Sequence, residues 1–537
     1  SGYTLATMSQ AAIIVASSDQ SVNAGADIIR AGGNVIDAAI AAAFATSAGE
    51  PSITSLAGGS VMVHRDASRD TVEIYDLFSN APGLGQTAGP VDFSGIDIYF
   101  PEGDTTQTFH IGRGAAAVPA TLGGLCNILH NRGRLELGEV LAPVIRDLEE
   151  GIEVQAYQVA CFRYLEEILK LSQLGRDQFF GADGKLLEIG DTFSNPVLAG
   201  TLRDLAGCPG DELESWLSNR ITRPVLEAFG PGAGGRITPA DIENWKPQVR
   251  PPLQFSFSQS KIFTNPAPSF GGPSIRHTLR LFEEAGGVET APGSPGRYAK
   301  LAAVFQSVSQ LRAEDPGIFD QAAADELFSD RLQRNLEGAG RTGNSADEPR
   351  TPGSTAHISV IDADGNAAGI TLSHGEGNGC EIPGTGILMN NFLGEEDLFP
   401  AGLGNFVPGQ RLSTMMAPTV IEHPSGAVSV LGSGGANRIR TAISQVACGL
   451  IVDGLEPGEA VSQGRIHVEN EVLSAESFAI DGSPESLAGA LQYARELDEF
   501  SVSGLFFGGV HLAHRKSDGT LVGAGDSRRN GVVSRVV

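Results

Sequence analysis

The chain has 537 residues, of which 41% are hydrophobic and 19% charged, and its formal net charge is −27. This composition is typical of a soluble globular protein with a large core. The negative charge argues against nucleic acid or an anionic membrane as a partner, because both are bound through a basic surface. No stretch reaches the roughly 20 apolar residues that a membrane-spanning helix needs.

The first residues and the cysteines leave the localisation open between cytoplasm and periplasm. The opening SGYTLATMSQ lacks the basic start and apolar run of a signal peptide. Five cysteines lie far apart and form no Cys-x-x-Cys pair, so neither a redox motif nor a metal site of that kind is predicted. We predict no cofactor.

Two alanine-rich helices are predicted near the start, over residues 21–31 and 35–47, with Asn34 as the cap of the second helix. A strand over residues 60–64 follows Gly58-Gly59. Two adjacent glycines allow one backbone to approach another closely.

Residues 110–350 show mostly helical patterns that are broken by glycine and proline. Residues 335–355 are rich in Gly, Asn, Pro, Asp and Ser and are predicted to form an exposed, mobile segment. From Thr355 onward the composition indicates strands, turns and glycine-rich loops up to the end of the chain.

The stretch STAHISVIDADGNAAGITLS, residues 354–373, predicts two strands around a tight turn. The first strand, 356–362, has Ile358 and Val360 on one face. An Asp-Gly turn, which tolerates positive φ angles, leads to the second strand, 367–373.

Thr355 stands where the first of these strands begins. If the chain is cut between Ser354 and Thr355, Thr355 carries a hydroxyl nucleophile and a free α-amine that serves as its base. An α-amine has a pKa of about 7.7–8.0, which suits a general base. Attack of the hydroxyl on the Ser354 carbonyl would make the cut self-inflicted. The alternative is that Thr355 is an ordinary β-branched strand residue.

Two later stretches are candidates for binding. In LGSGGANRIR, residues 431–440, Gly434-Gly435-Ala436 could present successive backbone N–H groups to an oxyanion; the alternative is a plain turn, and the lysine of a P-loop is absent. Glu395-Glu396-Asp397 could bind a substrate ammonium group, or form a solvated loop. His511 and His514 fall on opposite faces of a predicted strand, so a shared metal ion is not expected. A G-x-S-x-G elbow is absent, which argues against an α/β-hydrolase.

Together these segments resemble the γ-glutamyltranspeptidase family of N-terminal-nucleophile hydrolases over nearly the whole chain. The blocks that carry the resemblance follow in order: AGGNVIDAAIAAAFATSAGEP, GRGAAAVPATLGGLCNILHNRGRLELGEVLAPVI, GGRITPADIENWKPQVRPPL, STAHISVIDADGNAAGITLS, GTGILMNN, PGQRLSTMMAPTV, LGSGGANRIRTAISQ and GAGDSRRNGVV.

The resemblance implies an α+β fold of the αββα four-layer sandwich type. It also implies a precursor that is cut into a large subunit, residues 1–354, and a small subunit, residues 355–537, which stay together. Thr355 corresponds to the family's nucleophile and Ser373 to a hydroxyl residue that hydrogen-bonds the nucleophile. Gly435 and Ala436 correspond to the two oxyanion-hole positions.

Three departures from the family pattern affect the acyl pocket. Phe78 stands where γ-glutamyl enzymes have an arginine that clamps the glutamyl carboxylate, and an arginine–carboxylate pair has no aromatic substitute. Phe392 and Glu395 stand where the family has Gln and Asp, which accept from the glutamyl amine. Thr414 and Met415 align with a Ser-Ser pair.

The leading hypothesis is therefore a self-processed threonine enzyme that hydrolyses or transfers an acyl group from a small-molecule amide or peptide other than a simple γ-glutamyl amide. The first alternative is a true γ-glutamyl hydrolase or transferase in which Arg411 or Arg65 supplies the missing charge. The second is an uncleaved, inactive relative that acts as a binding protein. Whether the chain also forms a homodimer is left open.

Overall fold

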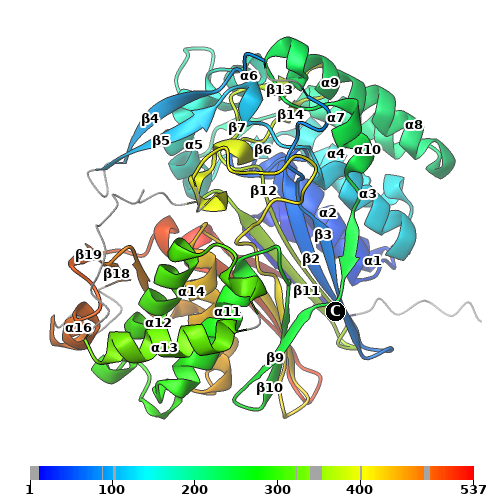
Figure 1. Ribbon diagram of the computed structural model, residues 1–537. Helices are drawn as coiled ribbons and strands as arrows, with labels where there is room; N and C mark the ends of the chain where they lie inside the picture. The colour runs from blue at the N-terminus through cyan, green and yellow to red at the C-terminus, as the bar shows by residue number, and fades with distance from the viewer. Residues whose placement is uncertain are drawn as a thin grey trace, which may run out of the picture.

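Two β-sheets form the centre of the molecule (Figure 1). The computed structural model describes residues 11–86, 89–100, 105–321, 323–338, 353–399, 402–476 and 484–537. The first sheet has seven strands, in the order β22 (Val532–Val536), β1 (Ala12–Ala16), β11 (Ala356–Asp362), β12 (Ala367–Ser373), β2 (Gly59–Asp66), β3 (Thr71–Leu77) and β8 (Gln248–Arg250). All neighbours in this sheet are antiparallel.

The second sheet has six strands and faces the first. Its order is β21 (Leu521–Ala524), β20 (Gly509–Arg515), β16 (Val428–Gly434), β15 (Thr419–Glu422), β10 (Ser260–Thr264) and β9 (Leu253–Phe257). Aliphatic side chains from both sheets, such as Val63, Ile361 and Val430, form one buried cluster between them. This packing follows the alternation of the strands, since every second side chain points into the space between the sheets.

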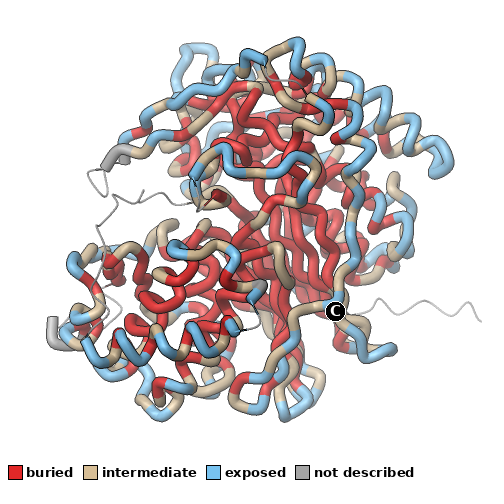
Figure 2. The backbone as a smooth tube through the Cα atoms, in the orientation of Figure 1, coloured by how far each residue is buried: buried red, intermediate tan, exposed pale blue. Residues whose placement is uncertain are grey.

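Helices cover the outer face of each sheet, which gives four layers and confirms the predicted αββα sandwich. α1 (Asp19–Arg30) and α2 (Val35–Gly49) pack on the seven-stranded sheet. α11 (Gly271–Glu284) and α14 (Arg438–Ile451) pack on the six-stranded sheet, and α12 (Pro295–Glu314) packs against α11. Figure 2 shows the buried residues concentrated in the sheets and on the inward faces of these helices.

The remaining elements surround this frame. The other α-helices are α3 (Thr121–Arg132), α4 (Leu137–Glu150), α5 (Ala156–Leu169), α6 (Gln173–Phe179), α7 (Pro196–Ala206), α8 (Leu213–Leu217), α9 (Arg223–Phe229), α10 (Pro239–Asn244), α13 (Ala324–Leu336), α15 (Pro457–Ser462) and α16 (Pro484–Leu491). The other strands are β4 (Ser94–Phe100), β5 (Thr105–Ile111), β6 (Ile152–Glu153), β7 (Thr192–Phe193), β13 (Glu381–Ile382), β14 (Ile387–Leu388), β17 (Ile466–Glu469), β18 (Val472–Glu476) and β19 (Glu496–Phe500).

The predicted N-terminal helices and the strand pair after Thr355 are confirmed. Asn34 accepts from the backbone of Asp37 (2.9 Å) while the Asp37 carboxylate accepts from the backbone of Asn34 (2.8 Å), which is a capping box. α2 is buried on all sides, which is why its sequence is mostly alanine rather than amphipathic. In β11, Ile358 and Val360 belong to the cluster that packs against the helices.

The structure differs from the prediction in two places. Residues 438–451, expected to be strand or loop, form the helix α14, and no side chain caps its start. The sequence before residue 438 therefore lacks the capping signal by which the start of a helix is predicted. The short hairpin of β9 and β10 interrupts the helical middle part and joins the second sheet. The predicted mobile segment lies mostly at residues 339–352, outside the described residues.

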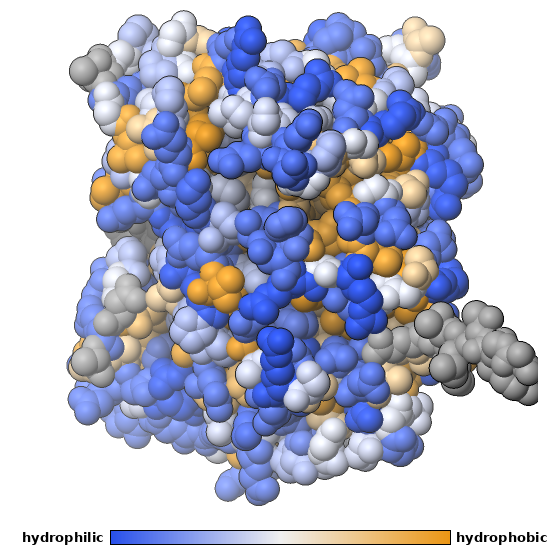
Figure 3. Space-filling model, turned by 90° about the vertical axis from the view of Figure 1, so that its right-hand side faces the viewer, coloured by the Kyte–Doolittle hydropathy of each residue, from blue (hydrophilic) through white to orange (hydrophobic). Residues whose placement is uncertain are grey.

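Polar side chains cover much of the surface (Figure 3). The face in Figure 3 is mostly hydrophilic, with smaller hydrophobic areas between the polar side chains. Among the described helices, none combines the length and the apolar character needed to cross a bilayer.

Candidate active site

The predicted nucleophile lines a large cavity of the described structure. Thr355 is buried at the start of β11 and lines a cavity of about 540 Å³. Seven other predicted site residues line the same cavity: Ser373, Ala436, Phe78, Phe392, Glu395, Thr414 and Met415. Segments that are far apart in the sequence therefore meet around Thr355.

Ser373 lies at the end of β12, beside Thr355. Its hydroxyl donates to the carbonyl oxygen of Ser354 and accepts from the backbone N–H of Gly375 (3.0 Å). In the continuous chain, the Ser373 hydroxyl thus holds the carbonyl that an attack by Thr355 would reach. Gly58 lies against this position, since a Cβ on Gly58 would be 2.0 Å from the Ser373 carbonyl oxygen.

The predicted oxyanion loop connects β16 to α14. Gly434 lies directly beside Thr355, because a Cβ on Gly434 would meet the Thr355 carbonyl oxygen at 2.0 Å. Gly435 has φ +116° and Ala436 has φ +47°, so both depart from ordinary right-handed geometry. A left-handed conformation is uncommon for a residue other than glycine and is a form of local strain. Gly353 packs over this loop, since its Cβ would be 2.7 Å from the Ala436 nitrogen.

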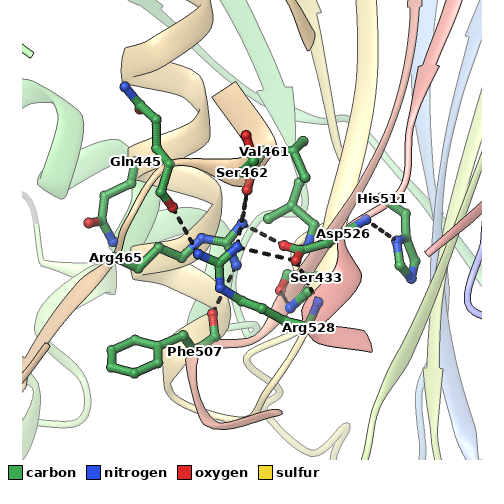
Figure 4. Close-up of polar contacts among 12 residues, drawn as sticks. Ser433, Gln445, Val461, Ser462, Arg465, Phe507, His511, Asp526 and Arg528 are labelled. Carbon is green, nitrogen blue, oxygen red and sulfur yellow. Dashed lines mark hydrogen bonds and ion pairs between the residues drawn. The ribbon is translucent and has the colours of Figure 1, made fainter. Parts of the chain in front are cut away.

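A buried ionic network supports the loop from behind (Figure 4). The Asp526 carboxylate accepts from Arg465 (2.6 Å) and from the backbone N–H of Val510 (2.9 Å), and Ser433 accepts from the backbone N–H of Gly509 (3.0 Å). Burial alone would raise the pKa of Asp526, but Arg465 and a second arginine hold it below its usual value. A charged network with all partners in place fixes local geometry.

The second arginine is Arg528, which bonds to Asp526 (3.2 Å) and Glu476 (2.5 Å). It belongs to the short turn of residues 527–529, near the C-terminal end of the chain. The network therefore anchors this turn beside the candidate site.

The wall of the cavity near Thr355 is partly aromatic. The rings of Phe78 and Phe392 are in contact, with centroids 4.8 Å apart, and both side chains are buried. A Cβ on Gly59 would meet the Phe78 ring at 2.5 Å, so Gly59 makes room for this ring. The two residues that replace polar family positions thus form one apolar surface.

Carboxylates also line this cavity, among them Glu376, Glu395 and Asp397. Burial raises the pKa of Glu376 to about 7 and the pKa of Glu395 well above its usual range. Glu395 is half-buried, but its Oε1 oxygen is shielded from solvent and has no hydrogen-bond partner among the described residues. Burial also raises the pKa of Asp397, which accepts from Asn437 (3.0 Å). Burial thus favours the protonated form of each of these three carboxyls.

The arginines proposed as substitute clamps lie elsewhere. Arg411 donates to the carbonyl of Phe78 and to the carbonyl of Lys246 (2.6 Å), so its guanidinium lies behind Phe78 and lines a neighbouring cavity. Arg65 bonds to Glu422 (2.8 Å) and to the backbone carbonyl of Gly365 (2.9 Å). Neither side chain lines the cavity of Thr355.

The sequence interpretation missed three residues. Arg312, on α12, lines the cavity and bonds to Asn437 (2.9 Å) and Glu469 (3.8 Å). Glu376 lines it three residues after Ser373. Arg529 contacts the backbone on both sides of Ser354. No local pattern marks Arg312 or Arg529, because their partners are far away in the sequence.

The chain matches known proteins over most of its length. Residues 21–536 match the family model described as Gamma-glutamyltranspeptidase. The chain is 31% identical over 528 residues to the acylase ACY 1 proenzyme of Pseudomonas sp. (strain SE83), a match that covers 95% of this chain and 90% of that protein. It is 26% identical over 535 residues to the glutathione hydrolase proenzyme of Bacillus subtilis (strain 168), with coverage of 94% and 88%.

A solved structure has the same fold. The cephalosporin acylase from Bacillus halodurans superposes with a TM-score of 0.76 at 22% identity, over 98% of this chain and 96% of that chain. This chain thus shares its αββα sandwich with that acylase. The chain belongs to the γ-glutamyltranspeptidase family. It is an enzyme of the amide hydrolase and acyltransferase kind, which confirms the predicted family, fold and enzyme class.

Proposed function

We propose that the chain cuts itself between Ser354 and Thr355 and then acts as an amidase through an acyl-enzyme on Thr355. The observation that carries this proposal is the position of Thr355 at the start of β11, inside the cavity and beside the Ser373 hydroxyl. The two products would be residues 1–354 and 355–537.

In the mature enzyme, the Thr355 hydroxyl oxygen attacks the substrate amide carbon and its proton passes to the α-amine. The backbone N–H groups of Gly435 and Ala436 stabilise the oxyanion, which is worth about 10²–10³ in rate per donor. The C–N bond then breaks, the amine leaves with the proton, and an ester on Thr355 remains. Water or an acceptor amine attacks this ester and releases the acyl group.

For the acyl group we propose a larger or more apolar group than γ-glutamyl. The contact between Phe78 and Phe392 supports this, because an apolar group gains about 25 cal/mol for each Å² that it buries there. A glutamyl carboxylate at this wall would lose water without gaining a clamp, at a cost of about 1–3 kcal/mol. Arg411 and Arg65 are bonded to partners outside the cavity of Thr355, which argues against the alternative in which either arginine replaces that clamp.

The self-cleavage is tested by intact mass and denaturing electrophoresis of the purified protein. We expect two fragments for the wild type and one full-length chain for Thr355→Ala, with Thr355→Ser as a matched control that keeps a hydroxyl. A wild-type chain that stays whole and still hydrolyses amides would exclude the mechanism. A whole chain without any activity would favour the binding-protein alternative.

The acyl preference is tested separately by comparing kcat/KM for anilides with γ-glutamyl, glutaryl and aryl-acyl groups. We expect the γ-glutamyl anilide to be the poorest of the three. A clear preference for γ-glutamyl would contradict the proposed acyl group while leaving the Thr355 mechanism intact.

A further inference from the structure

One guanidinium bridges the bond that self-cleavage would break. Arg529 Nη2 donates to the carbonyl of Gly353 (2.8 Å), and Arg529 Nη1 donates to the carbonyl of Thr355 (3.3 Å). These two carbonyls flank the carbonyl of Ser354. That middle carbonyl accepts instead from Ser373.

We infer that Arg529 is the positioning residue of the self-cleavage reaction, an inference that rests on the proposed cut between Ser354 and Thr355. With both flanking carbonyls held by one planar group, the peptide planes on either side of the Ser354–Thr355 peptide bond have fixed orientations. The Ser354 carbonyl then keeps its hydrogen bond to the Ser373 hydroxyl and its carbon stays within reach of the Thr355 hydroxyl.

The reaction that needs this orientation is an acyl shift. A bond forms between the Thr355 hydroxyl oxygen and the Ser354 carbonyl carbon, the C–N bond breaks, and the hydroxyl proton ends on the released α-amine. Water then hydrolyses the ester, which gives a Ser354 carboxylate and restores the Thr355 hydroxyl. Rates of such intramolecular steps depend steeply on alignment, and a misplacement of about 1 Å can cost about 10²-fold.

Arg529 is itself rigidly held. It is buried, its Nη2 also donates to the carbonyl of Leu505 (3.1 Å), and a Cβ on Gly509 would be 2.6 Å from the Arg529 Cβ. Its turn is anchored by the network of Asp526 and Arg528 described above. A positioning group has to be fixed by its own surroundings, and this side chain meets that condition.

Lysine cannot reproduce this arrangement. It keeps the positive charge but has one nitrogen, whereas arginine presents several donors in a rigid plane. Arg529→Lys therefore keeps the positive charge but removes the hydrogen bonds to two carbonyls at once, so it separates the effect of the charge from the effect of the geometry. The positive charge of Arg529 also acts on Glu50. Burial raises the pKa of Glu50, and the charge of Arg529 opposes this rise.

The test follows the appearance of the 355–537 fragment by intact mass over time in the wild type, Arg529→Lys and Arg529→Ala. We expect cleavage to be about 10-fold slower or more in Arg529→Lys and about 10²-fold slower or more in Arg529→Ala. Methylguanidinium added to Arg529→Ala should restore part of the rate, which a purely structural role would not allow. Arg535→Lys is the matched control, because Arg535 lies in the same C-terminal segment but donates to the Leu521 carbonyl. We expect this variant to mature at the wild-type rate.

Thermal midpoints of all variants accompany the time courses. Maturation of both Arg529 variants at the wild-type rate would overturn the inference. A loss of cleavage that follows the loss of thermal stability in both variants, without rescue by methylguanidinium, would also overturn it. A wild-type chain that never cleaves would instead overturn the proposed function on which the inference rests.

Discussion

At the scale of single residues, the oxyanion loop depends on two unusual backbone conformations. Gly435 has φ +116°, and a Cβ there would be 2.8 Å from the Cα of Gly508. Ala436 has φ +47°, which glycine adopts without strain. The loop therefore excludes a side chain at the first position and tolerates the loss of one at the second.

We expect Gly435→Ala to lower kcat by about 10-fold or more, because a Cβ displaces the loop and misaligns a donor. Ala436→Gly is the matched control and should leave kcat unchanged, since it keeps the backbone N–H. Its free energy of unfolding should change by less than about 1 kcal/mol, because relief of strain and greater chain entropy oppose each other. Steady-state kinetics and urea unfolding measure both effects. Equal kcat values in the two variants would remove Gly435 from the oxyanion hole.

The buried carboxyl of Glu376 is expected to make the stability of the folded protein depend on pH. Burial raises its pKa from 4.5 to about 7, so the folded protein binds this proton more tightly than the unfolded chain does. This tighter binding stabilises the folded protein below about pH 4.5, and the stabilisation is lost as pH rises through about 7. The total loss in the free energy of unfolding is roughly 3 kcal/mol. We expect Glu376→Gln to match the wild type near pH 4 and to exceed its stability near pH 8.

Urea unfolding of both proteins at the two pH values measures this difference, and exposed Glu396→Gln serves as the control. A stability difference that does not change between the two pH values would show that Glu376 is ionised in the folded protein. Comparison with the wild type removes the contribution of acids that do not interact with Glu376. The charge of Glu376 raises the pKa of Glu395, so the measured difference belongs to this pair of carboxyls.

Sequence reasoning brought several of these residues to the site but not all. Phe78 and Phe392 were placed together in the acyl pocket through a resemblance, and the structure puts their rings in contact. Arg411 was a candidate clamp, but its guanidinium bonds to backbone behind Phe78. Arg529 escaped notice, since its contacts with residues 353 and 355 cross more than 170 positions of the chain. Such contacts arise only from the tertiary fold.

At the scale of elements, the site depends on how closely β12 approaches the turn before β2. Gly58 lies in this turn, and a Cβ on it would overlap the carbonyl of Ser373 at 2.0 Å. The prediction that Gly58-Gly59 allows close approach of backbones is therefore confirmed. What the two glycines approach, Ser373 and Phe78, follows from the order of strands in the sheet and not from the local pattern.

We expect Gly58→Ala to lower the free energy of unfolding by about 1–3 kcal/mol, as overpacking does, and to slow self-cleavage because Ser373 is displaced. Gly49→Ala, at the end of α2, is the control: the nearest atom to its Cβ is 4.0 Å away, so neither property should suffer. Urea midpoints and the fraction of cleaved chain measure both. If Gly58→Ala is less stable but cleaves normally, then the close contact between Gly58 and Ser373 is not needed for self-cleavage.

Secondary structure was predictable where a local signal exists. The cap at Asn34 and the Asp-Gly turn after β11 each act within a few residues, so the sequence predicts them. α14 follows a glycine-rich loop without a capping side chain and is buried on nearly every side. Its position is determined by the sheet on which it packs, which local reasoning does not contain.

At the scale of the whole molecule, the two predicted fragments are interleaved. β11, β12 and β22 lie among strands of the first 354 residues in the seven-stranded sheet. In the six-stranded sheet, β9 and β10 of the first part extend the strands of the second part. Neither fragment contains all the strands of either central sheet, so neither can bury the apolar faces of these sheets alone.

The last prediction concerns the particle that remains after cleavage. We expect the two fragments to stay together on size exclusion and to unfold in one cooperative transition, because both central sheets contain strands of each fragment. Unfolding then releases two chains, so the Tm of the cleaved protein depends on its concentration. A hundredfold dilution weakens association by about 2.8 kcal/mol, which lowers the Tm by roughly 2–3 °C for a protein of this size. Thr355→Ala unfolds as one chain, so its Tm should not change on dilution. Two separate transitions, or fragments that part at micromolar concentration without denaturant, would contradict the shared core.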